Sequence, residues 1–173
     1  MFARDIDSSL VKVEEISKLY DLSDFDCGDK DLNEFLKKDS FNYRNQLIAK
    51  TFIVIHKEQV VAFFSVMNDA IKLKLEETEE TKQLIRLHEY PALKIGRLGV
   101  DKKFKRKGFG KFVIDFVKGL SRRINQISAC RFLTVDSYPD AVNFYEKHRF
   151  IRNLMYEKKR EFVSMRLDII DLI

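Results

Sequence analysis

A basic segment whose turn contains two glycines carries residue types that bind phosphate groups. It runs from Ile95 to Lys111 and reads as a buried strand, a turn and the start of a helix. Gly108 and Gly110 lack a Cβ, so the backbone can approach an anion closely, and the first N–H groups of the helix have no partner inside it. Positive charge around the turn comes from Lys105, Arg106, Lys107 and Lys111. These features predict a site for a phosphate or diphosphate.

The turn alone leaves more than one interpretation open. The GxxxxGK[ST] pattern of triphosphate-binding loops is absent, and a single G-x-G is only half of a dinucleotide-binding fingerprint. An ordinary strand-to-helix connection with solvated lysines fits the same residues. The helix itself is clearly predicted, because Phe109, Val113, Phe116 and Leu120 recur at helical spacing on one face.

A second segment, from Phe132 to Phe150, decides between these interpretations. It reads as a short apolar strand followed by a helix that begins at Pro139. Its residues Ala141, Phe144, Tyr145 and Phe150 match the pattern A-x-x-F/L-Y-x-x-x-G-F, while the sequence from Lys105 to Gly110 is similar to Q/R-x-x-G-x-G/A. With both motifs, the chain resembles the GNAT superfamily of acetyl-coenzyme A-dependent N-acetyltransferases.

The resemblance implies a coenzyme site and no metal. The glycine turn would bind the pyrophosphate of acetyl-CoA, and the strand before it would pair with the pantetheine arm through its main chain, with Gly99 permitting close approach. An N–H near a bulge in that strand would polarise the thioester carbonyl. The coenzyme-binding residues would be Leu98, Gly99, Val100, Lys105, Arg106, Lys107, Gly108, Phe109, Gly110 and Lys111.

Tyr145 is the residue that this family resemblance assigns as general acid. A phenol with a pKa of about 10 stays protonated at neutral pH and can protonate a departing thiolate. The alternative is that Tyr145 only packs beside Phe144. No general base of equal quality is found, which favours an acceptor amine of low pKa, such as an α-amino group.

Three positions depart from the family pattern. Lys105 stands where Gln or Arg is usual, which keeps the charge but loses the amide or fork geometry. Tyr138 stands where many relatives have an Asn that contacts the coenzyme. Arg149 replaces the customary Gly, so a shift of the turn after the last helix is expected.

A narrower resemblance concerns the acetyltransferase toxins of bacterial toxin–antitoxin modules, which acetylate the α-amino group of aminoacyl-tRNA. It is carried by the segments Phe25–Gly28, Leu32–Leu36 and Ile95–Asp101. A net charge of +5 suits an RNA substrate, because lysine and arginine contacts with phosphates supply non-specific affinity. The partners implied are acetyl-CoA, charged tRNA, a small ribbon-helix-helix antitoxin and a second copy of the chain.

Two other functions remain open at this point. A GNAT enzyme could acetylate a small-molecule or protein amine, and the acidic run from Glu76 to Glu80 would then attract a cationic substrate. A non-catalytic basic module that binds nucleic acid would show strongly salt-dependent binding and no affinity for coenzyme A.

The expected architecture is an α/β (α+β) GNAT fold. It has a mixed, mostly antiparallel sheet of about six to seven strands, with splayed central strands and helices on both faces. Besides the segments above, the expected elements are a strand at Val11–Ile16, a helix capped by Asp29, a hairpin of Thr51–His56 and Val60–Met67, an exposed helix or insert at Glu76–Glu89, and strands at Arg131–Val135, Ile151–Tyr156 and Phe162–Ile169.

Composition fits one domain over residues 1–173. A hydrophobic content of 45% with 15 Phe is enough to fill a core. Cys27 and Cys130 have no CxxC partner, so buried free thiols are expected rather than a disulfide framework or a zinc site. No apolar run approaches the roughly 18 residues of a membrane span, and the polar N-terminus is unlike a signal peptide, so a cytoplasmic protein is expected.

Overall fold

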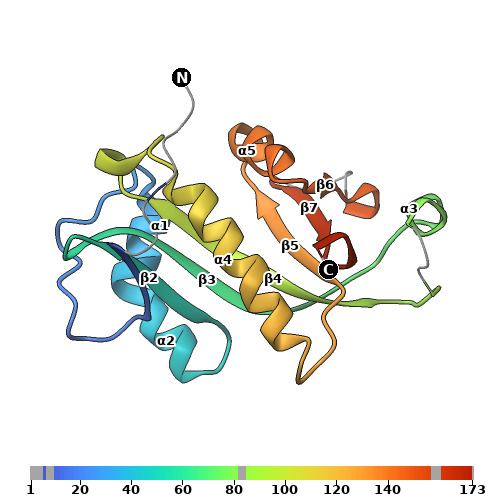
Figure 1. Ribbon diagram of the computed structural model, residues 1–173, viewed down its shortest axis with the longest axis horizontal. Helices are drawn as coiled ribbons and strands as arrows, with labels where there is room; N and C mark the ends of the chain where they lie inside the picture. The colour runs from blue at the N-terminus through green and yellow to red at the C-terminus, as the bar shows by residue number, and fades with distance from the viewer. Residues whose placement is uncertain (1–5, 7–9, 82–84, 157–160, 173) are drawn as a thin grey trace. The chain divides into compact units, whose positions relative to one another are not determined.

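Seven strands form the framework of the described part of the protein, in the order β1-β2-β3-β4-β5-β7-β6 (Figure 1). The computed structural model describes residue 6 and residues 10–81, 85–156 and 161–172. The strands are Val11–Glu15 (β1), Lys50–His56 (β2), Gln59–Ile71 (β3), Tyr90–Val100 (β4), Phe132–Ser137 (β5), Ile151–Arg152 (β6) and Val163–Asp168 (β7). The pairs β1/β2, β2/β3, β5/β7 and β6/β7 are antiparallel, which confirms the predicted mostly antiparallel sheet.

Ten helical segments connect or follow these strands in the described part of the chain. The α-helices are Lys30–Glu34 (α1), Ser40–Asn45 (α2), Leu75–Glu80 (α3), Phe109–Ile124 (α4) and Val142–Lys147 (α5). A π-helical segment, Phe35–Asp39 (η2), joins α1 to α2. Short 3-10 turns are Lys102–Phe104 (η3), Pro139–Ala141 (η4), Leu154–Tyr156 (η5) and Ile170–Leu172 (η6).

The chain divides into two compact units, each described here by itself. The first unit comprises residues up to Met67 together with Ile95–Phe116, and the second comprises Asn68–Lys94 and Val117 onward. Strands β3 and β4 and helix α4 each pass from one unit to the other.

The β2/β3 hairpin organises the first unit. Its two-residue connection, Lys57 and Glu58, has positive φ at both positions (50° and 64°), as a type I′ turn requires. His56 pairs with Gln59 across this turn. Asp29 caps α1 as predicted, because its carboxylate accepts the N–H of Leu32 at 2.9 Å.

Helices cover both faces of the sheet in the first unit. Phe63 and Phe64 are consecutive in β3, so their side chains point to opposite faces. Phe63 contacts Phe25 and Phe35, with ring centroids 5.6 and 6.3 Å apart, on the side of α1 and η2. Phe64 contacts Phe116 of α4, with centroids 5.6 Å apart. Helices on both faces were predicted, and this half of the sheet confirms them.

The second unit corrects two expectations from the sequence. The predicted strand at 151–156 is only two residues long and is followed by the turn η5. The acidic segment from Glu76 is not exposed throughout, because Glu77 and Thr78 of α3 are buried. Residues 82–84 of that predicted insert lie outside the described residues.

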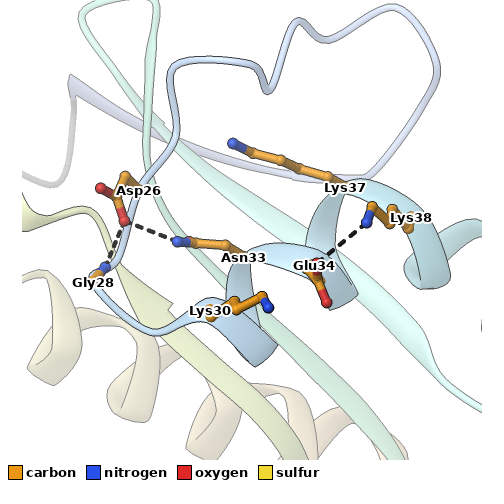
Figure 2. Close-up of a pocket in the computed structure, with 7 residues that line it drawn as sticks. All are labelled: Asp26, Gly28, Lys30, Asn33, Glu34, Lys37 and Lys38. Carbon is orange, nitrogen blue, oxygen red and sulfur yellow. Dashed lines mark hydrogen bonds and ion pairs between the residues drawn. The ribbon is translucent and has the colours of Figure 1, made fainter.

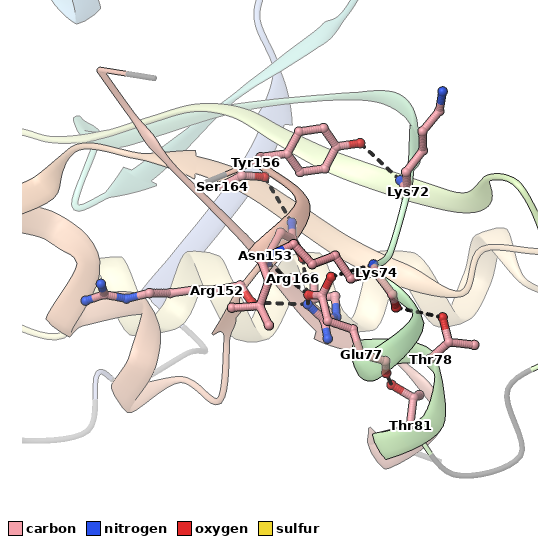
Figure 3. A network of polar contacts seen from close by, with 11 residues as sticks. Lys72, Lys74, Glu77, Thr78, Thr81, Arg152, Asn153, Tyr156, Ser164 and Arg166 are labelled. Atoms are coloured by element: carbon pink, nitrogen blue, oxygen red, sulfur yellow. Dashed lines mark hydrogen bonds and ion pairs between the residues drawn. The ribbon is translucent and has the colours of Figure 1, made fainter. Parts of the chain in front are cut away.

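A buried ion pair explains why Glu77 is not at the surface. Its carboxylate accepts a hydrogen bond from the guanidinium of Arg166 in β7, and both side chains are at most 5% exposed (Figure 3). The same carboxylate accepts the backbone N–H of Lys74 at 2.8 Å and that of Leu154 at 3.0 Å. Arg166 donates further to the side-chain oxygen of Asn153 at 2.8 Å. The network therefore fixes α3 to β7.

We expect Glu77→Ala to lower the free energy of unfolding by about 3–5 kcal/mol, because it leaves the Arg166 guanidinium buried without its partner. Urea denaturation measures the change. The double variant Glu77→Leu/Arg166→Met removes both charges and should cost less than the single variant. Equal losses in the two proteins would contradict this account of the pair.

Candidate active site

Strand β4 leads into the site and carries an irregularity. A Cβ built on Gly96 would lie 3.1 Å from Ser65 Oγ, and one built on Gly99 would lie 2.6 Å from the ring of Phe63. Ser65 and Phe63 are two residues apart in β3 and share a face, whereas positions 96 and 99 of a regular strand lie on opposite faces. Strand β4 therefore changes phase between Gly96 and Gly99, as at a β-bulge.

Gly99 is required by packing inside the first unit. The nearest neighbours of its absent Cβ are two ring atoms of Phe63, at 2.6 and 3.2 Å, and the Cβ of Cys27, at 3.4 Å. The sequence assigned this glycine to close approach of a coenzyme, whereas the structure gives it a steric reason within the protein. Leu98 and Val100, on either side of it, are half-buried.

Asp101 ends β4 and holds three segments together. Its buried carboxylate accepts the N–H of Lys103 at 2.8 Å, which caps η3, and the N–H of Asp26 at 3.1 Å. Its own N–H donates to the carbonyl of Val61 in β3 at 2.9 Å. The turn after β4 therefore starts from a fixed point.

Asp26 forms a second junction beside this point. Its carboxylate accepts hydrogen bonds from the side chain of Lys102 at 2.6 Å, the backbone N–H of Gly28 at 2.8 Å and the side chain of Asn33 at 2.8 Å. These hydrogen bonds hold the pKa of Asp26 well below its ordinary value, and the bond from Lys102 has the largest effect. Sequence analysis singled out Phe25–Gly28 as a motif but gave Asp26 no role.

The glycine turn has the conformation that a phosphate cradle needs. Gly108 has a φ of +95° and Arg106 a φ of +61°. Helical hydrogen bonding begins where the N–H of Phe112 donates to the carbonyl of Gly108 at 3.0 Å. The N–H groups of Phe109 and Gly110 consequently have no acceptor within α4, so they are available to an anion at the helix start.

Aromatic contacts fix the start of α4. Phe109 is 3% exposed, and its ring lies edge-on to those of His56 and Phe104, with centroids 5.5 and 5.8 Å apart. Lys107 lies over the ring of Phe104, with Nζ 5.0 Å from the centroid. Phe109 and His56 thus have structural roles, while Lys105, Arg106, Lys107 and Lys111 are exposed around the turn.

Tyr145 belongs to the second unit, in α5. It is 6% exposed, and its ring packs edge-on against Phe144 and Phe150, with centroids 5.0 and 5.5 Å apart. Burial raises the pKa of its phenol above the ordinary value of 10. The structure therefore shows both features weighed from the sequence: the tyrosine packs beside Phe144, and it is a phenol that stays protonated at neutral pH.

The end of α5 explains how Arg149 replaces glycine. Arg149 has a φ of +73°, the left-handed conformation usual for glycine at this position. Its N–H donates to the carbonyl of Glu146 at 2.9 Å, and the N–H of Phe150 donates to the carbonyl of Tyr145 at 3.1 Å. These two bonds, with the contact between Tyr145 and Phe150, form a Schellman motif. The turn thus keeps the glycine-type geometry with an arginine in it.

The predicted site residues are divided between the two units. Leu98 to Val100 and Lys105 to Lys111 lie on one continuous strand, turn and helix of the first unit, and Tyr145 lies in the second. Cys27 and Cys130 are free and buried, as predicted. In the described ranges no group of three or more His, Cys, Asp or Glu side chains is placed to hold a metal, and no helix is long and apolar enough to cross a membrane.

Comparison with known proteins decides the family. The model of the acetyltransferase (GNAT) domain matches residues 24–169. The chain belongs to the GNAT acetyltransferase family. This GNAT protein is thus an N-acetyltransferase, and acetyl-CoA is the acetyl donor of its family. The left-handed Gly108 and the open N–H groups after it fit the phosphates of that donor.

Solved structures of toxins are similar to this GNAT chain. A tyrosine-to-phenylalanine mutant of KacT is 20% identical, with a TM-score of 0.81 over 95% of this chain and 99% of that one. AtaT complexed with acetyl-methionyl-tRNAfMet is 18% identical, with a TM-score of 0.81 over 94% and 96%. AtaTR bound with acetyl-CoA is 18% identical, with a TM-score of 0.78 over 95% and 96%. At these identities the likeness establishes the fold.

We expect Gly99→Ala to lower the free energy of unfolding by about 1–3 kcal/mol, because the added methyl overlaps the Phe63 ring. Chemical denaturation tests this. Adding Phe63→Leu should restore part of the loss in the Gly99→Ala background. If Phe63→Leu lowers the stability of Gly99→Ala by as much as it lowers that of the wild type, overlap with the ring is not the cause of the loss.

Gly108→Ala should weaken coenzyme A binding about tenfold or more, because a side chain at this φ strains the turn that presents the N–H groups. Isothermal titration with coenzyme A measures the affinity. Gly119→Ala is the matched control. Gly119 lies in α4, the helix after the turn, and apart from the helix's own backbone nothing lies within 4 Å of an added Cβ. That control should keep full affinity and gain about 0.5–1 kcal/mol of stability. Unchanged affinity in Gly108→Ala would move the phosphate site elsewhere.

Proposed function

We propose that this GNAT enzyme transfers the acetyl group of acetyl-CoA to the α-amino group of an aminoacyl-tRNA. The observation that supports acetyl-CoA as the donor is the turn at Gly108, where the N–H groups of Phe109 and Gly110 at the start of α4 lack acceptors within the helix. The acceptor half is supported by the likeness to AtaT, whose structure was determined with acetyl-methionyl-tRNAfMet. An antitoxin partner is part of the proposal, because AtaT is also known bound to the C-terminus of AtaR.

The acetyl-CoA donor would be held by main-chain N–H groups and by positively charged side chains. The N–H groups of Phe109 and Gly110 would bind the pyrophosphate, and the exposed cations Lys105, Arg106, Lys107 and Lys111 would neutralise it. Leu98, Gly99 and Val100 would pair with the pantetheine arm through backbone groups. The phase change of β4 near these residues, like a β-bulge, would leave main-chain groups out of regular pairing, as this role needs.

Tyr145 would act as the general acid. When the amine nitrogen bonds to the thioester carbonyl carbon, the carbon–sulfur bond breaks and the phenol protonates the departing thiolate, while the proton of the amine passes to water. Burial raises the pKa of Tyr145, which alone makes it a weaker acid than the sequence suggested. The same exclusion of water also destabilises a thiolate, so the two pKa values shift in the same direction.

The choice of acceptor amine rests on its pKa, because the sequence offers no general base as well suited to its role as Tyr145 is to that of general acid. An α-amino group with a pKa of 7.7–8.0 is neutral in roughly a tenth of molecules at pH 7, whereas a lysine amine is neutral in about one in a thousand or fewer. The α-amino group of aminoacyl-tRNA thus reacts without strong assistance. The net charge of +5 supports a phosphate-bearing substrate.

A second candidate acceptor is a cationic small-molecule or protein amine. It is favoured by Glu76, Glu79 and Glu80 of α3, which are exposed. Purified enzyme with labelled acetyl-CoA, given either a charged tRNA pool or a panel of amines, separates the candidates. Mass spectrometry of nuclease-digested tRNA should detect N-acetyl-aminoacyl-adenosine. Acetylation of amines alone would overturn the tRNA proposal.

We expect Tyr145→Phe to lower kcat about a hundredfold with little change in the affinity for acetyl-CoA. Because the raised pKa keeps the phenol protonated, wild-type kcat/KM should rise from pH 6 to 8 as the amine loses its proton and should not fall before about pH 10. Tyr43→Phe, in the other unit, is the control and should keep full activity. Full activity of Tyr145→Phe would leave protonation of the thiolate to water.

A further inference from the structure

We propose that a pocket beside α1 binds phosphates of the RNA acceptor, a step that rests on the function proposed above. The pocket has a volume of about 470 Å³ and lies entirely within the first unit (Figure 2). Its lining is polar and carries three lysines; it consists of Asp26, Gly28, Lys30, Asn33, Glu34, Lys37 and Lys38.

Both carboxylates of the pocket are already neutralised by the protein. Asp26 accepts hydrogen bonds from Gly28, Asn33 and Lys102, as described above. Glu34 forms an ion pair with Lys38 at 3.2 Å, one turn further along the helix. Figure 2 shows the contacts of Asp26 with Gly28 and Asn33, and that of Glu34 with Lys38, on the walls of the pocket. The acidic groups therefore do little to attract a cation.

Two lysines of the pocket retain charge for a ligand. Lys30 is exposed and forms no ion pair with any residue that the structure describes. Lys37 donates to the backbone carbonyl of Ser23 at 2.9 Å. Hydrogen bonds from Ser23 lower the pKa of Asp21, and the charge of Lys37 adds to that effect. Lys30 is thus the stronger anion-binding group, Lys37 is intermediate, and Lys38 is already paired.

The pocket adjoins the turn that is expected to hold the coenzyme. Lys102 of η3 binds Asp26 on its wall, and Lys105 Nζ lies 3.6 Å from where a Cβ on Gly28 would be. Lys105, Arg106, Lys107 and Lys111 surround the glycine turn, whereas Lys30 and Lys37 come from α1 and η2. Two neighbouring sets of cations would therefore allow two anionic substrates to bind side by side.

The chemistry of the lining favours a nucleic acid over an acidic protein. Protein–protein interfaces have cores enriched in aromatic and apolar side chains, and none lines this pocket. Interfaces with nucleic acids are polar, positively charged and wet. A lysine ammonium binds a phosphate as a point charge, without a required geometry. Such a contact suits the sugar–phosphate backbone, which is common to all tRNAs although their base sequences differ.

The test compares three lysine variants of the full chain with a charged tRNA pool and acetyl-CoA. Lys30→Ala should raise KM for tRNA about fivefold at 0.1 M salt. It should also reduce the slope of log kcat/KM against log salt by about 0.7–0.9, the contribution of one phosphate contact. Lys37→Ala should have a smaller effect in the same direction. Lys18→Ala is the matched control and should behave as wild type, because Lys18 is an exposed lysine of the same unit that does not line the pocket.

Three readouts make the result decisive. The KM for acetyl-CoA and the melting temperature should be unchanged in all variants. A raised KM for acetyl-CoA in Lys30→Ala would assign the pocket to the coenzyme and overturn the inference. Wild-type tRNA kinetics in Lys30→Ala would overturn it as well, with the proposed function intact. A wild-type enzyme that acetylates no tRNA would instead refute the proposed function, and tRNA binding independent of Lys30 would then remove this inference too.

Discussion

The site depends on one buried carboxylate at the end of a strand. Asp101 joins β3, the segment around Asp26 and the cap of η3, because its N–H and both of its oxygens are used. Everything that follows it, from the lysines of the turn to the start of α4, extends from that junction. A carboxylate is suited to this position, because it can accept from two separate backbone segments at once.

Much of the first unit was predictable because its determinants are local. Residues close together in the sequence determine the β2/β3 hairpin, the cap at Asp29 and the apolar face of α4. The left-handed Gly108 follows in the same way from its residue type. These local signals were enough to place the expected phosphate turn at the end of a buried strand.

The features that the sequence did not reveal depend on distant partners. Glu77 looked like one of a run of surface acids, and only its pairing with Arg166, 89 residues away, shows why it is buried. Gly99 looked like a position for ligand approach, and only the Phe63 ring beside it gives the steric reason. The role of Asp26 likewise depends on Lys102, 76 residues further along. No pattern of period 2 or 3.6 contains such information.

The hairpin tip has a practical consequence for measuring ligand binding. His56, at the base of the tip, packs on Phe109, the first residue of α4, and Glu58 is only two residues along the chain from His56. Both native thiols are buried, so a single cysteine introduced at position 58 would react selectively with a fluorescent dye. Such a reporter would sense occupancy of the turn from outside it, while leaving its lysines and glycines untouched.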